Sequence, residues 1–188
     1  MNTWEIEPAH VLHVAQLAVK LAHFWRAYQP VAPDEISILE AAALLHDIGW
    51  AQTADRDGKG HHKISERMIL EANWDHDLAP YVPVVAAVAR YHRKRGPKDT
   101  DLAYSQLSPQ SKQTVYRMAS LLRLADALDR MHQQIWDIIN LEPVSSHSVC
   151  VWVQARQKTS IREVESAWQK KSDLAREVWN CDWVLRQV

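Results

Sequence analysis

Apolar side chains in the first 130 residues return every three or four positions, and this spacing limits what the chain can fold into. Between Pro8 and about Tyr28 they recur at Val14, Leu17, Leu21, Phe24 and Tyr28. Residues with that spacing lie along one side of an α-helix. The segment therefore predicts an amphipathic helix with one buried face, and His10 extends its stripe by one turn.

Four further helices are predicted from the same spacing and from residues that start and stop helices. They run through ILEAAALLHDIG to near Gly49, from about His61 to Asn73, from about Leu78 to His92, and from about Pro109 to Ile139. In the third helix His61, Ile64 and Met68 share a face, and in the fourth the stripe is Tyr81, Val85, Val88 and His92. Ser108 is the expected N-cap of the longest helix, with Pro109 at its first position.

The last 45 residues have a different pattern. SVCVWVQA alternates as a short strand does, a helix with a capping-box glutamate at Glu163 is expected to open at Ser160, and CDWVLRQV is a candidate partner strand. Trp168, Trp179 and Trp183 are expected to hold this tail against the body. We therefore predict an all-α fold in one domain, residues 1–188, with a helical core of about 8–142 and a small α/β extension of about 143–188.

Composition limits the partners and the compartment. The chain has 188 residues and a formal net charge of -1, so no overall field attracts nucleic acid or an anionic membrane. Its longest apolar run, 82–89, is far shorter than the ~20 residues that span a bilayer. The N-terminus lacks the basic start and apolar stretch of a signal peptide, and the two cysteines have no metal-ligand spacing. These features predict a cytoplasmic protein without a membrane or nucleic-acid partner; a homodimer is left open.

Histidines and aspartates stand at or next to the ends of the predicted apolar stripes. They are His10, His46 with Asp47, His61, His92 and Asp126. A buried imidazole must find a hydrogen-bond partner or bind something, because an unsatisfied polar group costs free energy. Imidazoles and carboxylates together suit divalent transition metals. Asp47 is the candidate bridge between two ions, because a carboxylate can bridge and an imidazole cannot.

Simpler interpretations exist for each of these residues. A single buried histidine is more often a hydrogen-bonded core residue than a ligand, and this interpretation is kept for His13, His23, His62, His76, His132 and His147, with a substrate contact left open for His62. An aspartate on a helix commonly pairs with a cation one turn away, and Arg123 and Arg130 flank Asp126 in this way. The joint pattern is what favours a metal site.

The same residues resemble the HD superfamily of metal-dependent phosphohydrolases, whose ligands come in the order His, His-Asp and a distant Asp. Here these are His10, His46-Asp47 and Asp126. The chain is most similar to the C-terminal HD-like domain of the exopolyphosphatase and guanosine pentaphosphate phosphohydrolase family. The similarity rests on HVLHVAQLA, LEAAALLHDIGW, GHHKIS, ARYHRKRGPK and LLRLADALDR.

This resemblance implies a helical HD fold with one or two divalent ions: Mn, Fe, Ni or Zn, with Mg also open. It assigns His10, His46, Asp47 and Asp126 to one ion and Asp47, His61 and His92 to the other, with Ser65 as the small residue that follows His61 by four positions. Two departures limit it. Exopolyphosphatases carry their phosphatase site in preceding actin-like domains that this sequence lacks, and Trp50 stands where several HD hydrolases place a lysine.

The expected function is hydrolysis of a phosphomonoester, a nucleotide or polyphosphate by a metal-activated water. Asp47 and Lys63 are the candidate catalytic residues. The candidate substrate-binding residues are the cations beside the metal ligands: Lys63, Arg93, Lys94, Arg95 and Arg130. The alternative is a non-catalytic regulatory module that binds polyphosphate or a nucleotide through RYHRKRGPK.

Overall fold

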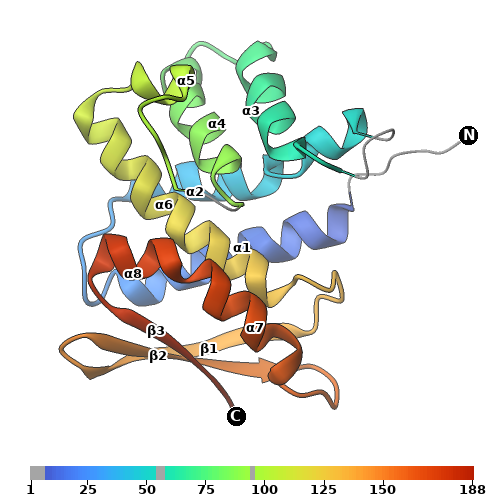
Figure 1. Cartoon of the computed structure of the whole chain (residues 1–188), viewed down its shortest axis with the longest axis vertical. Helices are drawn as coiled ribbons and strands as arrows, with labels where there is room; N and C mark the ends of the chain where they lie inside the picture. Colours follow the sequence, from blue (N-terminus) through green and yellow to red (C-terminus); the bar gives the residue numbers. More distant parts are fainter. Residues whose placement is uncertain (1–6, 54–57, 94–95) are drawn as a thin grey trace, which may run out of the picture.

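Helix α6 (Pro109–Leu128) is the centre of the molecule, as the computed structural model in Figure 1 shows. The structure describes residues 7–53, 58–93 and 96–188. Ser108 caps the helix by accepting a hydrogen bond from the Ser111 N–H at 3.1 Å, as predicted. All residues of α6 from Met118 onward are buried. A helix that is buried all round needs neighbours on every side, and α6 packs against α1, α2, α4, α7 and α8.

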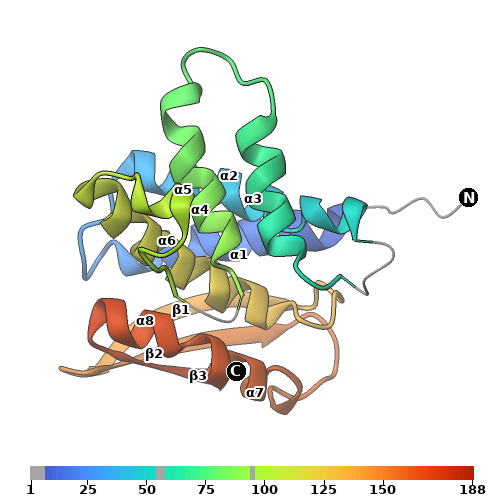
Figure 2. The same cartoon turned by 45° about the horizontal axis from the view of Figure 1, so that its top comes forward.

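The remaining helices surround α6 and confirm the predicted bundle (Figure 2). They are α1 (Pro8–Trp25), α2 (Pro33–Leu45), α3 (His61–Glu71), α4 (Val82–Arg90), α5 (Leu102–Ser105), α7 (Arg162–Lys171) and α8 (Asp173–Trp179). Two short 3-10 helices, η1 (Ile48–Gln52) and η3 (Ala79–Tyr81), precede α3 and α4 respectively. None of the described helices combines the length and the apolar character that crossing a membrane requires.

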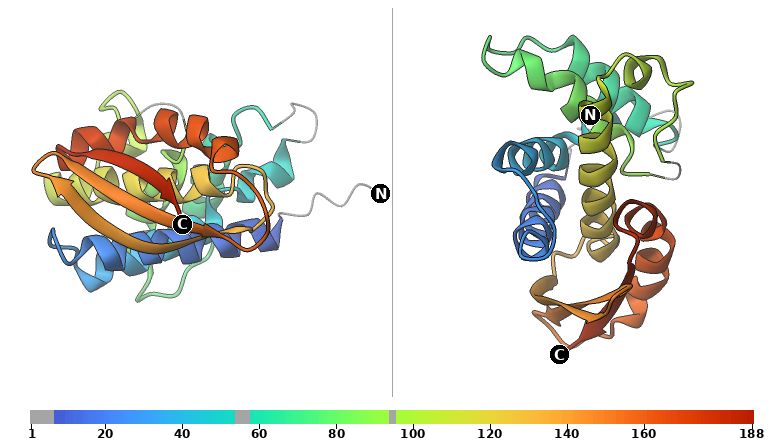
Figure 3. Two further views of the ribbon diagram at one scale, coloured as in Figure 1. Left: turned by 90° about the horizontal axis from the view of Figure 1, so that it is seen from below. Right: turned by 90° about the vertical axis from the view of Figure 1, so that its left-hand side faces the viewer.

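A three-stranded sheet lies beside the helices, and Figure 3 shows it from two sides. Its strands are β1 (Trp136–Ser145), β2 (Ser148–Ala155) and β3 (Asp182–Gln187), in the order β1-β2-β3. β1 and β2 form an antiparallel hairpin, whereas β3 is parallel to β2. Two parallel neighbours need a crossover connection, and α7 with α8 provides it.

Tryptophans join this C-terminal part to the bundle, as predicted. The ring of Trp25 on α1 lies 5.5 Å from that of Trp179 and 4.8 Å from that of Trp183. Trp168 is fully buried, and its indole N–H donates to the carbonyl oxygen of Trp183 at 2.7 Å. The extension is therefore packed onto the core instead of hanging from it.

The prediction of an all-α fold was wrong in one respect, because the sheet begins inside the segment expected to be helical. Helix α6 ends at Leu128 instead of Ile139, and β1 begins at Trp136. The chain turns between them through positive φ angles at His132 and Gln134, and Asp129 accepts a hydrogen bond from the Gln134 N–H at 2.7 Å. No glycine or proline occurs between positions 110 and 142 to mark this turn in the sequence.

Smaller errors concern helix ends and faces. α1 ends at Trp25 instead of Tyr28, and residues 79–81 form η3 ahead of α4. α3 buries His61, Ser65 and Ile69, whereas Ile64 and Met68 are only partly buried. The capping box at Glu163 does not form, since α7 begins at Arg162 without a side-chain cap, and α5 and α8 were not predicted. The strand predictions for SVCVWVQA and CDWVLRQV are confirmed.

The central position of α6 leads to a stability prediction. Leu122→Ala should lower the free energy of unfolding by about 2 to 5 kcal/mol, because Leu122 is fully buried and its truncation leaves a cavity. The matched control Leu102→Ala, at a side chain that is 74% exposed, should change it by less than about 0.5 kcal/mol. Urea denaturation measures both, and equal losses would contradict this packing.

Candidate metal centre

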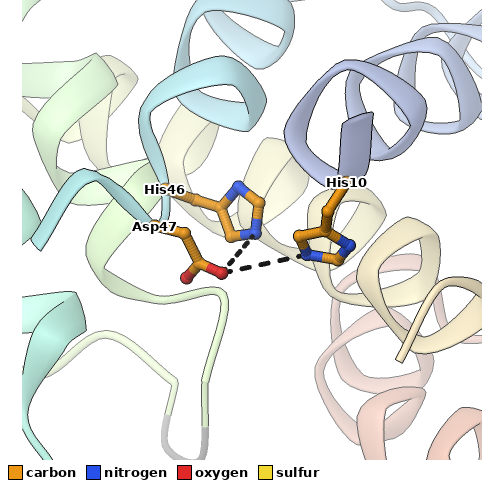
Figure 4. A group of neighbouring side chains, drawn as sticks. All are labelled: His10, His46 and Asp47. Atoms are coloured by element: carbon orange, nitrogen blue, oxygen red, sulfur yellow. Dashed lines mark ion pairs between the residues drawn. The ribbon is translucent and has the colours of Figure 1, made fainter. Parts of the chain in front are cut away.

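The pair His46 and Asp47 lies where α2 ends, so that two adjacent residues can face one point (Figure 4). Inside a helix they would point about 100° apart. α2 stops at Leu45, His46 is its C-cap, and Asp47 has φ -106° and ψ 5°, outside the helical region. His10 on α1 faces the same carboxylate from the opposite side.

Gly49 and Ser65 hold the start of α3 close to this turn. A Cβ atom at Gly49 would lie 2.2 Å from the carbonyl oxygen of His61, so only glycine fits here. The Ser65 hydroxyl donates to the carbonyl oxygen of His46 at 2.7 Å and accepts from the Gly49 N–H at 2.9 Å. This close approach places His61 beside Asp47.

The two carboxylate oxygens of Asp47 face two different pairs of histidines. Oδ2 lies 3.8 Å from Nε2 of His10 and 3.6 Å from Nε2 of His46. Oδ1 lies 3.1 Å from Nε2 of His61 and 3.5 Å from Nε2 of His92. The ligand atoms of each group, His10/His46/Asp47 and Asp47/His61/His92, lie within 4.8 Å of one another and could hold a metal ion. Asp47 belongs to both groups.

Hydrogen bonds at the other ring nitrogen fix the tautomer of these histidines. Nδ1 of His46, His61 and His92 lies 2.6, 2.8 and 2.6 Å from the carbonyl oxygens of Ala43, Gly58 and Ala89. A carbonyl oxygen only accepts, so each Nδ1 carries the hydrogen and each neutral ring presents a lone pair at Nε2. For His61 the carbonyl contact is shorter than the 3.3 Å contact of the same Nδ1 with Nη1 of Arg93.

His10 is held in the same way by a carboxylate, with its Nδ1 2.8 Å from Oδ2 of Asp129. All four Nε2 lone pairs are therefore directed at an acceptor, the Asp47 carboxylate. Lone pairs that face an anion at 3.1 to 3.8 Å repel one another unless a cation lies between them.

Several of these buried atoms have no hydrogen bond. Nε2 of His10, Nε2 of His46 and Oδ1 of Asp47 lack a partner among residues 7–53, 58–93 and 96–188. Leaving such an atom unsatisfied costs about 1 to 3 kcal/mol. Divalent transition metals, one in each group, would satisfy all three, and a set of imidazoles and carboxylates is the donor set that such metals prefer.

The protonation states also suit a metal. Burial opposes ionisation of Asp47, but positive charge on His46, His92 and His61 in their protonated forms, with a hydrogen bond from His61, outweighs it and holds the pKa of that carboxyl well below its usual range. Burial, together with the nearby His46, lowers the pKa of His92 well below its usual value. Metal ligands must be deprotonated, and these two groups are deprotonated at neutral pH.

Asp126 stands at the edge of the first group. Its Oδ1 lies 3.9 Å from Nε2 of His10, and its Oδ2 forms an ion pair with Lys171 of α7. Burial opposes ionisation of Asp126, but Lys171 and the nearby imidazoles lower its pKa. The ion-pair partner of Asp126 is therefore Lys171, 45 positions further along the chain, and neither Arg123 nor Arg130 takes this role. Arg123 pairs with Asp173 instead.

Comparison with protein families gives one match, a model described as the HD domain, over residues 9–131. This covers more than half of the 188 residues. The chain belongs to the HD domain family. HD domain proteins bind divalent metals and are generally metal-dependent phosphohydrolases. No curated protein matches the chain significantly.

Two residues that support His10 were not predicted from the sequence to do so. Asp129, which is buried, holds Nδ1 of His10, and His132 stacks on the His10 ring at 3.8 Å with an interplanar angle of 6°. Nδ1 of His132 in turn lies 2.6 Å from Oε2 of Glu7. Asp129 could have been found as the second aspartate of LADALDR, whereas the place of His132 depends on the unpredicted turn after α6.

The predicted metal-binding residues all lie at one cavity wall or directly behind it. The cavity has a volume of about 450 Å³ and is lined by Asp47, Trp50, His61, His92, Arg93, Arg123, Asp126, Arg130, His132, Ala167, Lys170 and Lys171. Trp50 stacks on the His61 ring at 4.7 Å, so it covers one side of that ligand instead of offering a charge.

The predicted substrate-binding residues divide into three groups. Arg93 and Arg130 line the metal-centre cavity. Lys63 lines a neighbouring cavity of about 330 Å³, which also contains His62 and Arg93. There burial and the surrounding cations lower the pKa of His62 to about 4. Lys94 and Arg95 lie outside the described residues.

The hydrogen bond behind His10 gives a first prediction for the site. Asp129→Asn should weaken metal binding by about 10- to 100-fold. The asparagine oxygen must accept the Gln134 N–H, so its NH₂ group faces His10 Nδ1 and favours the tautomer with hydrogen on Nε2. Zn²⁺ or Mn²⁺ titration against a chelating dye measures this. The control Asp137→Asn, which removes a partly exposed ion pair with Lys20, should keep wild-type affinity; equal affinities in both variants would refute the role of Asp129.

The close approach of α3 to Gly49 leads to a second prediction for the site. Gly49→Ala should lower the free energy of unfolding by about 1 to 3 kcal/mol and weaken metal binding, because the methyl group forces α3 and its His61 away from Asp47. Gly60→Ala, where the new Cβ meets open space but φ is +84°, should cost about 1 to 2 kcal/mol while leaving metal affinity unchanged. Thermal unfolding and metal titration separate the two effects, and unchanged metal affinity in Gly49→Ala would contradict the packing argument.

Proposed function

We propose that this HD domain protein is a metal-dependent phosphohydrolase that acts on a phosphomonoester, a nucleotide or polyphosphate. The observation that carries the proposal is the Asp47 carboxylate with four imidazole lone pairs directed at its two oxygens. Such an arrangement needs cations, and it opens into a cavity large enough for a small ligand.

Two ions are the natural occupancy of this arrangement. His10, His46, Asp126 and Oδ2 of Asp47 would hold one, and His61, His92 and Oδ1 of Asp47 would hold the other. Divalent metals at such a centre activate a water and neutralise phosphoryl oxygens. Mn, Fe, Ni and Zn suit the imidazole-rich donor set, and Mg is the least suited of the candidates.

The remaining roles fall to cations of the chain. Arg93 and Arg130 line the metal-centre cavity, where their guanidinium groups can bind phosphate oxygens in a bidentate way. Lys63 is exposed and lines the adjoining cavity, so it is suited to hold a more distant phosphate group of the substrate; a direct catalytic role for Lys63 stays a prediction. Arg93 belongs to both cavities and would link them.

The second candidate is a non-catalytic module that binds polyphosphate or a nucleotide. It is favoured by the adjoining cavity, whose lining includes Lys63, Arg90, Arg93 and Lys98 with a single carboxylate, Asp101.

Phosphate release tests the proposal. The protein is assayed with p-nitrophenyl phosphate, nucleotides and tripolyphosphate in the presence of Mn²⁺, Ni²⁺ or Mg²⁺. Asp47→Asn should lower turnover by about 100-fold or more, because several kcal/mol of charge stabilisation are lost with the bridging carboxylate. The control Asp77→Asn, at a fully exposed carboxylate, should retain wild-type activity.

The same assay separates the two candidate functions. Circular dichroism checks that Asp47→Asn is folded. No phosphate release from any substrate by the metal-loaded wild type, together with polyphosphate binding that survives in Asp47→Asn, would reject the hydrolase and favour the binding module.

A further inference from the structure

The C-terminal extension reaches into the metal-centre cavity with positive charge. Helix α7 contributes Lys170 and Lys171 to the cavity wall. Arg123 and Arg130 line the same cavity and come from the last part of the chain that the HD family model covers. α7 packs directly on α6. Part of the cavity wall therefore comes from outside the matched family region.

Arg123 is the least expected member of this wall. Its side chain is 2% exposed, and Nη2 donates to Oδ1 of Asp173 at 2.6 Å. Nε and Nη1 are buried and find no partner within the part of the chain that the structure describes. Burial lowers the pKa of Arg123 even though Asp173 opposes this. A buried guanidinium with unused donors on a cavity wall is an incomplete site, because each unused donor costs free energy.

The charge of the cavity indicates what would complete it. Five cationic side chains line it, against the carboxylates of Asp47 and Asp126: Arg93, Arg123, Arg130, Lys170 and Lys171. The two carboxylates are also the groups that a metal ion would neutralise. A cation bound by Asp126 would compete with Lys171 for the same carboxylate and free the ammonium group for another anion. The net positive charge of the cavity wall is therefore larger than the charge that one phosphoryl group would neutralise.

We propose that Arg123, Lys170 and Lys171 form an anion subsite for a second phosphate group of the ligand, so that the substrate carries at least two linked phosphates. Guanidinium and ammonium groups are the usual partners of phosphate oxygens, and Arg123 offers two free donors of a rigid fork. The inference rests on the proposed function for the reacting phosphate, which lies at the metal centre, and narrows its substrates to diphosphates, triphosphates and polyphosphates. A simple phosphomonoester would leave the subsite empty.

Calorimetry with two non-hydrolysable probes tests the subsite without relying on catalysis. Methylphosphonate and methylenediphosphonate are titrated into the metal-loaded protein. The wild type should bind the diphosphonate at least about 10-fold more tightly, as one or two added charge-assisted hydrogen bonds predict. Arg123→Met and Lys170→Gln should each reduce the ratio of the diphosphonate affinity to the methylphosphonate affinity several-fold. Arg162→Gln, at the exposed first residue of the same helix, should keep it.

The variants and outcomes keep the inference separable from the proposed function. Arg123→Met replaces a buried charge by an apolar side chain of similar length, and Asp173, which is half exposed, can be solvated. Lys170 is exposed, so Lys170→Gln should fold normally. A ratio near one in the wild type, or a ratio that neither variant lowers, would overturn the subsite even if the protein hydrolyses phosphomonoesters. If the wild type prefers the diphosphonate and both variants reduce this preference, but no substrate releases phosphate, the proposed hydrolase activity is rejected and the subsite is retained.

Discussion

The metal centre of this protein depends on the Asp47 carboxylate and the four imidazole lone pairs directed at it, which repel one another. Without a cation, acceptors would face acceptors at 3.1 to 3.8 Å around a buried anion. The bundle brings them together from separate elements, His10 from α1, His46 from the end of α2 and His61 from the start of α3. Packing of the apolar faces around α6 supplies the free energy that holds this unfavourable arrangement in place.

A shared local feature gives this arrangement its direction. His46, His61 and His92 each place Nδ1 on the carbonyl oxygen three residues earlier in the chain. His46 and His92 lie just beyond the C-terminal end of a helix, where the last carbonyls have no intrahelical partner, whereas His61 begins α3 and uses the carbonyl of the preceding Gly58 turn. Local backbone carbonyls therefore orient all three rings, and Trp50 additionally stacks on the ring of His61. His10, inside α1, has no such carbonyl and depends instead on Asp129.

The extension and the family region have different chemical contributions. Residues 9–131 contain every predicted metal ligand, whereas α7 adds two lysines to the cavity wall. Because β3 pairs in parallel with β2, the chain must cross over the sheet through α7 and α8, and this crossover presses α7 against α6. The sheet therefore positions the lysines of α7 at the metal centre, although none of the predicted metal ligands comes from the sheet.

The sequence by itself determined the helical bundle, the family and the set of metal-binding candidates, because helical periodicity and the His46-Asp47 pair are local patterns. It also predicted Asp47 as the shared carboxylate, and the structure gives that residue one oxygen for each group of histidines. Only the tertiary structure decided the end of α6, the partner of Asp126 and the support of His10. Each of these depends on residues far apart in the chain, such as Lys171 against Asp126 and Asp129 against His10, whose encounter no local spacing encodes.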